Sequence, residues 1–422
     1  MYQDLKGIKP FGNKIWLSSP TMHGDEQKWV NDAFVKNWIT TAGENINEVE
    51  KLVAEYLCVE YAVALSCGTT SLHLATRLAG ERLYGQARPN CGTLQGHKVF
   101  CTDMTFNAPV NAVLYEGGEP VFIDTEYATW NMSPDALERA FELYPDVKLV
   151  MLVHLYGVPA KIDEIRAVCR KHGALIVEDA AEAFGACYKG RNVGSLCDYG
   201  TISFNGNKII TGSTGGVFLT CEKNDADKVR KWSTQSKEPA PWYQHEEIGY
   251  NYRMSNIVAG IIRGQMGYLD EHISRKKEIY ERYKKGFEDL PVTMNPYDVK
   301  NSEPNFWLSC MLVNSDVMCR QTRSDSEPAY LPEKGKSCPT EISETLAKFN
   351  VESRPIWKPM HMQPVYGNFA FVTADGVDSI SQQNKSDVGA DIFARGLCLP
   401  SDIKMTPEEQ DKIIEIVRSC FE

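Results

Sequence analysis

Lys148-Leu149-Val150-Met151-Leu152-Val153 is an almost unbroken apolar run, and Ala174-Leu175-Ile176-Val177 is a second one. Strands that read as continuous apolar runs between helices belong to parallel sheets, because helices cover such sheets on both faces. The two runs therefore predict an α/β fold with a mostly parallel sheet.

The same alternation of strands and helices extends upstream. Ser133-Pro134-Asp135 is a helix start, with a capping Ser, Pro at the first helical position and an early acid. The other expected elements are helix 46–57, strand 61–65, helix 71–78, strand 98–101, helix 110–115 and strand 120–124. This order indicates one α/β unit.

The pattern changes after the strand-like run 215–220. The remaining expected features are a long charged helical stretch at 257–290, a strand at 306–312, a helix at 338–349 and polar insertions at 81–97 and 318–336. We therefore expect a large α/β domain over 1–275, which includes the N-terminal segment, and a smaller α+β C-terminal domain over 276–422.

Composition excludes several classes of protein. Lys+Arg of 45 against Asp+Glu of 56 gives a formal net charge of -11, which argues against a nucleic-acid binder. The 13 cysteines form no C-x-x-C pair, a pattern that favours reduced thiols over disulfides or a metal site. The N-terminus has no apolar signal region, and no run approaches the ~20 apolar residues that span a bilayer. We expect a cytoplasmic protein with no metal, nucleic-acid or membrane partner.

Chemistry is expected at the carboxyl ends of the strands, where open α/β sheets bind ligands. Asp124, His154 and Asp179 each stand at or just past such an end, and Lys208 closes the downstream run Ser203-Phe204-Asn205-Gly206-Asn207-Lys208. A lysine amine can capture a carbonyl as a Schiff base, and an acid beneath a pyridinium nitrogen keeps that nitrogen protonated. Lys208 and Asp179 therefore indicate a pyridoxal phosphate (PLP) site. The alternative is a solvated lysine and an unrelated strand-end acid.

Gly68-Thr69-Thr70 lies between a strand and a helix, where backbone N–H groups and hydroxyls can hold a phosphate. Many strand-to-helix turns are rich in Gly and Thr for local reasons, so the motif alone is a weak signal. Ser203 and Asn205 can add phosphate contacts, although a strand-end hydroxyl is the plainer interpretation of Ser203.

Other candidates have two interpretations each. Phe106 follows a strand end and either stacks on a planar ring or belongs to the core. His154 either contacts a ligand or is a hydrogen-bonded group behind the site. Asn251 and Arg253 either reach an anion or begin an exposed helix. An irregular stretch that suits a nucleotide-diphosphate pocket or a packed surface loop holds Arg354, Trp357 and His361.

In combination and in order, these segments resemble the DegT-type nucleotide-sugar aminotransferases, PLP enzymes with the aspartate-aminotransferase fold (fold type I). The matching segments are Ser66-Cys67-Gly68-Thr69-Thr70, Thr105-Phe106-Asn107-Ala108, His154-Leu155-Tyr156-Gly157, Glu178-Asp179-Ala180-Ala181-Glu182-Ala183, Ser203 to Lys208, Gly249-Tyr250-Asn251-Tyr252-Arg253 and Arg354-Pro355-Ile356-Trp357. The resemblance runs from about Leu17 to Leu399. Within the family, the chain is most similar to the branch that aminates UDP-linked 4-keto-6-deoxy-N-acetylglucosamine on the way to bacillosamine.

The resemblance implies a role for each matching residue. Lys208 would hold PLP as a Schiff base, Asp179 would pair with the pyridine nitrogen, and Asn251 would reach the phosphate from the neighbouring subunit of a homodimer with shared active sites. Glu182 would face the ring hydroxyl, where many members have Gln or His. The cofactor-binding candidates that result are Gly68, Thr69, Phe106, Asp179, Glu182, Ser203, Asn205, Lys208 and Asn251, and the substrate-binding candidates are His154, Arg253, Arg354, Trp357 and His361.

The implied activity is transfer of an amino group from L-glutamate to C4 of the UDP-linked keto-sugar, for bacterial glycan biosynthesis. Some relatives that dehydrate or deoxygenate sugars replace the Schiff-base lysine with His, so a lysine at position 208 favours transamination. Two alternatives stay open: an aminotransferase for another keto-sugar nucleotide or carbon, such as C3, and a catalytically silent PLP-binding protein.

Overall fold

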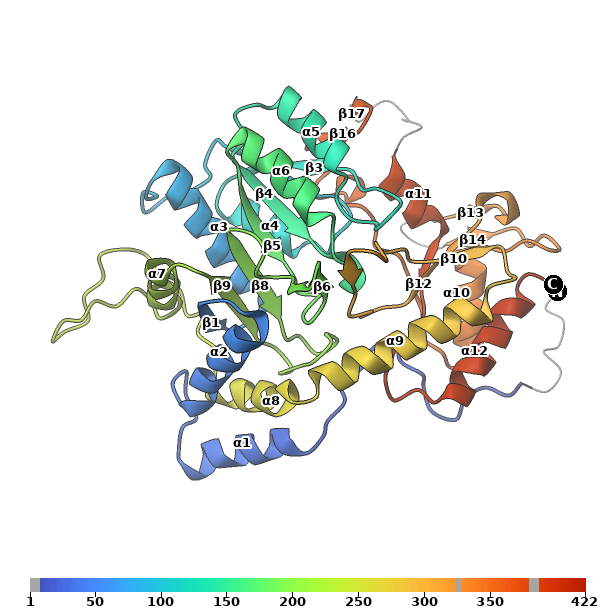
Figure 1. Ribbon diagram of the computed structural model, residues 1–422, viewed down its shortest axis with the longest axis horizontal. Coiled ribbons are helices and arrows are strands. Elements are labelled where there is room, and N and C mark those ends of the chain that lie inside the picture. Colours follow the sequence, from blue (N-terminus) through green and yellow to red (C-terminus); the bar gives the residue numbers. More distant parts are fainter. Residues whose placement is uncertain (1–7, 324–327, 379–386) are drawn as a thin grey trace.

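A nine-stranded sheet forms the centre of the computed structural model, which describes residues 8–323, 328–378 and 387–422 (Figure 1). Its strands lie in the order β1 (Tyr61–Leu65), β9 (Gly216–Thr220), β8 (Tyr199–Ser203), β5 (Leu175–Asp179), β4 (Leu149–Val153), β2 (Lys98–Thr102), β3 (Glu119–Ile123), β16 (Phe371–Thr373) and β17 (Gly376–Asp378). The strands from β8 to β16 are parallel neighbours, whereas β9 runs antiparallel to both β1 and β8. The predicted, mostly parallel α/β sheet is confirmed.

Helices cover both faces of this sheet, as the apolar strands predicted. In β4, Leu149 and Met151 pack into one core cluster, and Val150 and Leu152 pack into another on the opposite face. The first face is covered by α3 (Gly68–Tyr84), α4 (Ala108–Tyr115) and α7 (Lys223–Ser233), and the second by α2 (Glu44–Leu57), α5 (Pro134–Leu143), α6 (Ile162–His172) and α8 (Asn256–Met266). Burial on both sides explains why β4 is apolar at every position.

Local signals define several of these helices. Ser133 accepts a hydrogen bond from the Ala136 N–H and Pro134 follows it, so α5 begins where the sequence predicted. The predicted helical stretch 257–290 is instead two helices, α8 and α9 (Leu269–Gly286), separated at Gly267 and Tyr268. Figure 1 shows α9 running from the large sheet towards the C-terminal part of the chain.

A second, antiparallel sheet lies in the C-terminal part. It has the order β10 (Val292–Met294), β12 (Cys310–Val313), β18 (Gly396–Cys398), β15 (Arg354–Pro355), and its core includes α9, α10 (Pro339–Lys348) and α12 (Pro407–Ser419). The strand predicted at 306–312 is shorter than expected, because Phe306 has a left-handed backbone (φ 52°) that an extended strand does not allow. The polar insertion 318–336 contains a short pair, β13 (Gln321–Thr322) and β14 (Ala329–Tyr330), and its residues 324–327 lie outside the described part.

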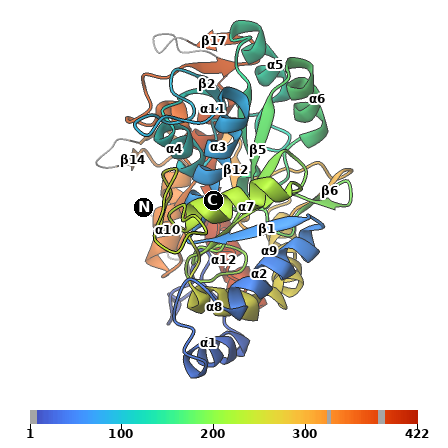
Figure 2. The ribbon, with the colours of Figure 1, turned by 90° about the vertical axis from the view of Figure 1, so that its left-hand side faces the viewer.

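Two segments cross the domain boundary predicted at 275/276. Ile15 pairs with Val351 and packs into the C-terminal core, so the N-terminal segment accompanies the smaller unit before α1 (Asp25–Val35) packs along α8 (Figure 2). In the other direction, β16 joins the large sheet beside β3. The boundary itself falls inside α9, so one helix belongs to both units.

The described helices and cysteines were compared with the features expected of membrane-spanning and disulfide-bonded proteins. In residues 8–323, 328–378 and 387–422, no helix is long and apolar enough to cross a membrane. All 13 cysteines lie in this described part and carry free thiols.

Candidate active site

The strand register brings the predicted site residues to one edge of the sheet. Val153 pairs with Asp179, and Asp179 pairs with Thr201 in the next parallel strand. The carboxyl ends of β4, β5 and β8 therefore lie side by side, and His154, Asp179 and Ser203 stand at that edge.

Lys208 lies in the loop between β8 and β9, in a turn closed by its own N–H donating to the Asn205 carbonyl at 3.0 Å. Its Nζ is 3.9 Å from Glu182 Oε1 and 4.1 Å from the centre of the Trp307 ring. Only 12% of the Lys208 side chain is exposed. Burial lowers the pKa of Lys208, although the charges of Glu182 and Asp179 act in the opposite direction. A less basic amine has more of the neutral, nucleophilic form.

Asp179 is the last residue of β5 and is buried. Burial raises its pKa, while the Ala181 N–H that donates to Oδ1 at 3.0 Å and the charge of Lys208 act to lower it. A buried carboxylate with a raised pKa is short of positive charge. A protonated ring nitrogen over Asp179 would supply that charge.

Glu182 is the second buried acid near the Lys208 amine. Its Oε2 accepts the backbone N–H of Tyr156 at 2.6 Å. Tyr156 has a left-handed backbone (φ 53°), uncommon outside glycine, which fits a constrained position at a site. Burial raises the pKa of Glu182 to about 7, with Lys208 and the Tyr156 N–H opposing the rise. Glu182 can therefore exchange a proton near neutral pH.

The Trp307 ring lies directly under the Lys208 amine. The sequence pattern had placed Trp307 in a strand. Its position depends on Asn305, whose Oδ1 accepts the Trp307 N–H at 2.9 Å. The Asn305 amide in turn donates to the carbonyls of Glu182 at 2.9 Å and Phe184 at 3.0 Å. An Asn two residues before a Trp gave no periodic signal that could have revealed this arrangement.

The predicted phosphate residues meet at the N-terminus of α3. A Cβ added to Gly68 would lie 2.7 Å from Ser203 Cβ, so only glycine lets the helix start approach the end of β8 this closely. Thr70 is occupied in capping, since its Oγ1 accepts the Cys67 N–H at 3.2 Å. Thr69 stands beside it in the first turn, and Asn205 is exposed just past Ser203. Backbone N–H groups at such a helix start suit an anion.

The aromatic candidates Phe106 and Trp357 also come together. Phe106 is 58% exposed and therefore not a core residue, and its ring lies 5.6 Å from that of Trp357. The Trp357 N–H donates to the Tyr156 hydroxyl at 3.0 Å, which ties this pair to Glu182 through Tyr156.

A cleft of about 620 Å³ opens beside this group. Three tryptophans, Trp16, Trp307 and Trp357, line it together with Arg354 and Lys358. Arg354 is well exposed, and its guanidinium lies 2.9 Å from the Glu352 carboxylate. The cleft thus combines aromatic faces with exposed cations, and Asn207 connects it to Lys208.

His154 lies behind the site and not in it. Its side chain is completely buried, its Nε2 is 2.9 Å from Glu178 Oε1, and its Nδ1 accepts the Ala160 N–H at 3.1 Å. Because Nδ1 accepts, Nε2 carries the proton and donates to Glu178. This geometry fits the hydrogen-bonded alternative for His154 and leaves no ring nitrogen for a substrate.

His361 is likewise engaged with protein groups. Its Nδ1 is 2.8 Å from Asp103 Oδ2 and its Nε2 is 3.1 Å from Asp387 Oδ2. Burial opposes its charge, but these two acids outweigh the penalty and raise the pKa of His361 to about 10. Nearby, Asp124 accepts the N–H groups of Val388 and Gly389 at the start of α11 (Val388–Arg395). His361 and Asp124 therefore fasten α11 to the large sheet.

Asn251 and Arg253 differ in accessibility. Arg253 is held inside its own subunit, where Nη1 contacts Glu50 Oε1 at 2.6 Å and the Ala64 carbonyl at 2.9 Å. Asn251 is exposed, between Tyr250 and Tyr252, whose rings stack at 4.7 Å. Of the two side chains, only that of Asn251 is exposed to solvent.

The residues fit PLP in three respects. Lys208 offers a buried amine, Asp179 is a buried acid that lacks a full counter-charge, and Gly68 with Ser203 forms a close approach at a helix N-terminus. An amine, an acid and an anion site are the three contacts that a pyridine aldehyde with a phosphate requires.

Known proteins show the same fold and related sequences. The chain is 38% identical over 414 residues to EpsN of Bacillus subtilis (strain 168), named as a pyridoxal phosphate-dependent aminotransferase, with 97% of this chain and 96% of EpsN covered. It is 32% identical to a GDP-perosamine synthase of Escherichia coli O157:H7, covering 96% and 98% of the two chains. The PLP form of Spr1654 from Streptococcus pneumoniae, a sugar aminotransferase by name, superimposes with a TM-score of 0.81 at 23% identity, covering 96% and 98%.

The family model described as "DegT/DnrJ/EryC1/StrS aminotransferase family" matches residues 20–418. This span includes Lys208, Asp179, Glu182 and the start of α3 at Gly68. The fold-type I architecture expected from the sequence is thereby confirmed. The chain belongs to the DegT/DnrJ/EryC1/StrS aminotransferase family and is a PLP-dependent aminotransferase.

Proposed function

We propose that this enzyme transfers the amino group of L-glutamate to C4 of a UDP-linked 4-keto-6-deoxy-N-acetylhexosamine, in the bacillosamine branch of glycan biosynthesis. The observation that carries the proposal is the cleft of about 620 Å³, with its tryptophans and cations, opening next to Lys208. A nucleotide base needs aromatic faces and a diphosphate needs cations. The cysteines are all free thiols, which supports a cytoplasmic setting.

PLP would be held by Lys208 at its aldehyde carbon, by Asp179 at its ring nitrogen and by Gly68, Thr69 and Ser203 at its phosphate. Phe106 is the exposed aromatic side chain placed to cover the ring. Bound there, PLP supplies an electron sink for the carbanion that forms when the amino acid α-carbon loses its proton.

Lys208 would be the group that moves protons. Its Nζ is 3.9 Å from Glu182 Oε1, and its lowered pKa increases the share of the neutral amine, the form that can take up a proton. Glu182, with a pKa of about 7, can buffer that transfer. Asp179 would stabilise positive charge on the ring nitrogen and so favour electron withdrawal.

Substrate would be bound from the cleft side. Trp16 is 46% exposed and lines the cleft together with Arg354 and Trp357, so its indole is a candidate for stacking on the base. Arg354 and Lys358 are the cations that could pair with the diphosphate. His154, Arg253 and His361 are left out of the proposed substrate contacts, because each side chain is engaged by a protein acid.

We further propose a homodimer with shared active sites. Exposed apolar residues gather at the end of α1 and just beyond it, an unusual surface for a monomer. They are Phe34, Val35, Trp38 and Ile39. The loop after α7 projects from the body of the molecule (Figure 1) and carries Trp242 at 66% and Tyr243 at 82% exposure. Asn251 at its base is the residue proposed to reach the partner's phosphate site.

A GDP-linked substrate is the second candidate, because a relative of 32% identity is a GDP-perosamine synthase. Both candidates need the same chemistry at Lys208 and differ in the base that the cleft accepts.

The test is product analysis by NMR. Purified enzyme with PLP and L-glutamate would receive UDP-linked 4-keto-6-deoxy-N-acetylhexosamine, a GDP-linked 4-keto-6-deoxyhexose and a 3-keto-sugar nucleotide in parallel. The proposal expects a 4-amino product at the highest kcat/KM from the UDP sugar. A higher value for the GDP sugar would select the second candidate. No product from any sugar, with a visible band that glutamate does not change, would leave a silent PLP-binding protein.

A further inference from the structure

The peptide that precedes Lys208 is held by two distant parts of the chain. The carbonyl oxygen of Asn207 accepts the Ser18 hydroxyl at 3.2 Å and the Trp307 indole N–H at 2.6 Å. Ser18 comes from the N-terminal segment, and Trp307 from the segment between β11 (Ser302–Glu303) and β12. Two donors on one carbonyl fix the plane of that peptide, and the next residue along it is Lys208.

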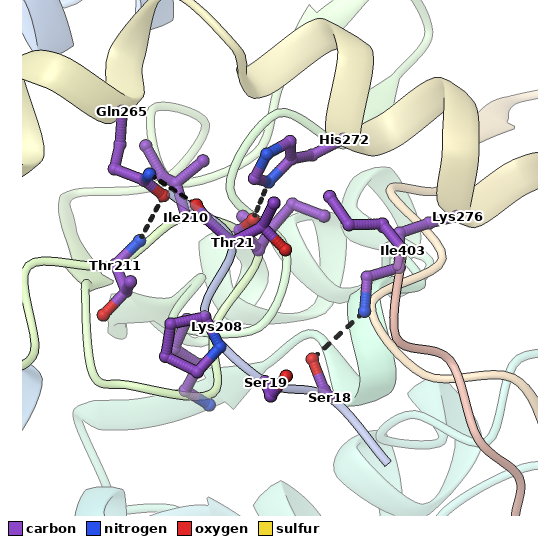
Figure 3. Close-up of a pocket in the computed structure, with 12 residues that line it drawn as sticks. Ser18, Ser19, Thr21, Lys208, Ile210, Thr211, Gln265, His272, Lys276 and Ile403 are labelled. Atoms are coloured by element: carbon purple, nitrogen blue, oxygen red, sulfur yellow. Dashed lines mark hydrogen bonds between the residues drawn. The ribbon is translucent and has the colours of Figure 1, made fainter. Parts of the chain in front are cut away.

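One buried lysine holds both of these donors. Lys276, on α9, is 3% exposed, and its Nζ donates to Ser18 Oγ at 3.1 Å and to the Trp307 carbonyl at 3.0 Å. Figure 3 shows the Lys276 side chain reaching from α9 to Ser18, with Lys208 across the same small cavity. Ser18 thus accepts from Lys276 and donates to Asn207, which makes a relay of hydrogen bonds to the peptide before Lys208.

The cavity between these residues is too small for a ligand. Its free volume is about 10 Å³, enough at most for one water, and it is lined by Ser18, Lys208, His272 and Lys276 among others. Within the described residues, no carboxylate forms an ion pair with Lys276. Burial lowers the pKa of Lys276 to about 7, and only the more distant charge of Asp402 acts to raise it.

Burying an amine without an acid is unfavourable, so packing alone would favour an apolar side chain here. The two hydrogen bonds of Lys276 end on groups that both hold Asn207. We propose that Lys276 is a positioning residue for Lys208: it holds Ser18 and Trp307 where they fix the Asn207 peptide, and so sets the position of the Lys208 amine above Trp307 and beside Glu182. This inference depends on the proposed role of Lys208 in holding the cofactor.

The test compares Lys276→Met with Lys277→Met, a matched change at the exposed neighbouring position on α9. Each PLP-loaded protein is titrated with pH while its visible absorption is recorded, and kcat and KM are measured for both substrates. We expect Lys276→Met to shift the midpoint of the spectral titration and to lower kcat about 10- to 100-fold with KM nearly constant, as a misplaced reacting group does. Lys277→Met should behave as the wild type.

Ser18→Ala provides a second variant that leaves α9 untouched, and it decides the question if Lys276→Met does not fold. It should move the spectral midpoint in the same direction by less, and the double variant should move it no further than Lys276→Met alone, because both act through one relay. An unchanged midpoint in Ser18→Ala, or a Lys276→Met variant that loses only thermal stability, would overturn the inference.

Borohydride reduction of the loaded wild type followed by peptide mass analysis separates this failure from failure of the proposed function. Labelling of Lys208 together with an unchanged Lys276→Met would overturn the positioning role alone. Labelling of another lysine would overturn the role of Lys208 and the inference with it.

Discussion

Two clusters of acids and bases lie at the same edge of the sheet and behave in opposite ways. Around His361, the acids Asp103 and Asp387 each contact a ring nitrogen, and the pKa of the imidazole rises to about 10. Around Lys208, Asp179 and Glu182 are buried with raised pKa values, and the amine lies 3.9 Å from the nearer acid. In the first cluster both ring nitrogens of the imidazole are paired with an acid, although burial also raises the pKa of Asp103. The second is short of positive charge and is therefore ready to receive a cationic ring.

A structural cluster differs from a ligand-binding one in how completely the protein pairs its buried acids and bases. His154 and Glu178 repeat the first pattern, since Glu178 also accepts the N–H groups of Gly194 at 2.5 Å and Leu196 at 2.9 Å. Groups whose every partner is supplied by the protein have nothing left for a ligand. In the Lys208 cluster, the carboxylates of Asp179 and Glu182 are buried, but the protein does not pair them completely.

Replacing Lys208 with Ala should have the largest effect, since it removes the amine on which the incomplete cluster depends. We expect kcat/KM to fall by about 10⁴-fold or more, because both the covalent attachment and the proton carrier are lost. Steady-state kinetics with glutamate and a keto-sugar nucleotide would measure this. Lys277→Met is the control, and turnover of Lys208→Ala within tenfold of the wild type would contradict the assignment.

Replacing Asp179 with Asn should lower kcat by about 10³-fold, because the neutral amide no longer stabilises positive charge on the ring nitrogen. The Ala181 N–H can still donate to the amide oxygen, so the fold should be kept. Single-turnover absorbance changes after glutamate addition would show the slower step. A rate equal to that of the wild type would mean that Asp179 does not face the ring.

Replacing His361 with Gln should alter stability and not chemistry. In the folded chain His361 binds a proton up to a pKa of about 10, against an ordinary value of 6.5. Its stabilisation is therefore complete below pH 6.5 and is lost as the pH rises to 10. We expect the variant to lose about 2–3 kcal/mol of unfolding free energy at pH 6 and far less at pH 10.

Denaturant titration at several pH values measures this difference. His245→Gln, at an exposed loop position, is the control and should keep the stability of the wild type. A loss of equal size at pH 6 and pH 10 would show that His361 acts by packing alone, against Phe371 at 3.9 Å for example.

Of the four replacements, Glu182→Gln should have the smallest effect, and we expect it in the stability of the protein without PLP. Because burial raises the Glu182 pKa from 4.5 to about 7, the folded state holds a proton that the unfolded chain releases, and stability falls as the pH rises through that window. The amide avoids this loss, so the variant should be more stable at pH 8 by about 1–2 kcal/mol, a value discounted for the nearby Lys208 charge. Thermal unfolding at pH 5 and pH 8 tests it, with the exposed Glu415→Gln as control.

The pattern of residues was enough to predict the sheet and its coverage by helices on both faces. Continuous apolar runs such as 148–153 require burial on both faces, and ligands of such sheets bind at the strand ends, which pointed to Asp179 beside the lysine motif of Lys208. The motifs also suggested roles for Phe106, which is exposed beside Trp357, and for Gly68 and Ser203, which approach each other closely. These signals are local or periodic, so a linear pattern contains them.

Whether each candidate is free to bind depends on contacts that the fold creates. His154, His361 and Arg253 carry the right chemical groups, yet each is held by an acid distant in sequence: Glu178, Asp103 or Glu50. Trp307 became relevant because it reaches Asn207 from 100 residues away, and Lys276 because α9 brings it to Ser18 and Trp307. Charge pairing and hydrogen bonding depend on distance in space, and no pattern of spacing along the chain specifies which carboxylate will reach which nitrogen.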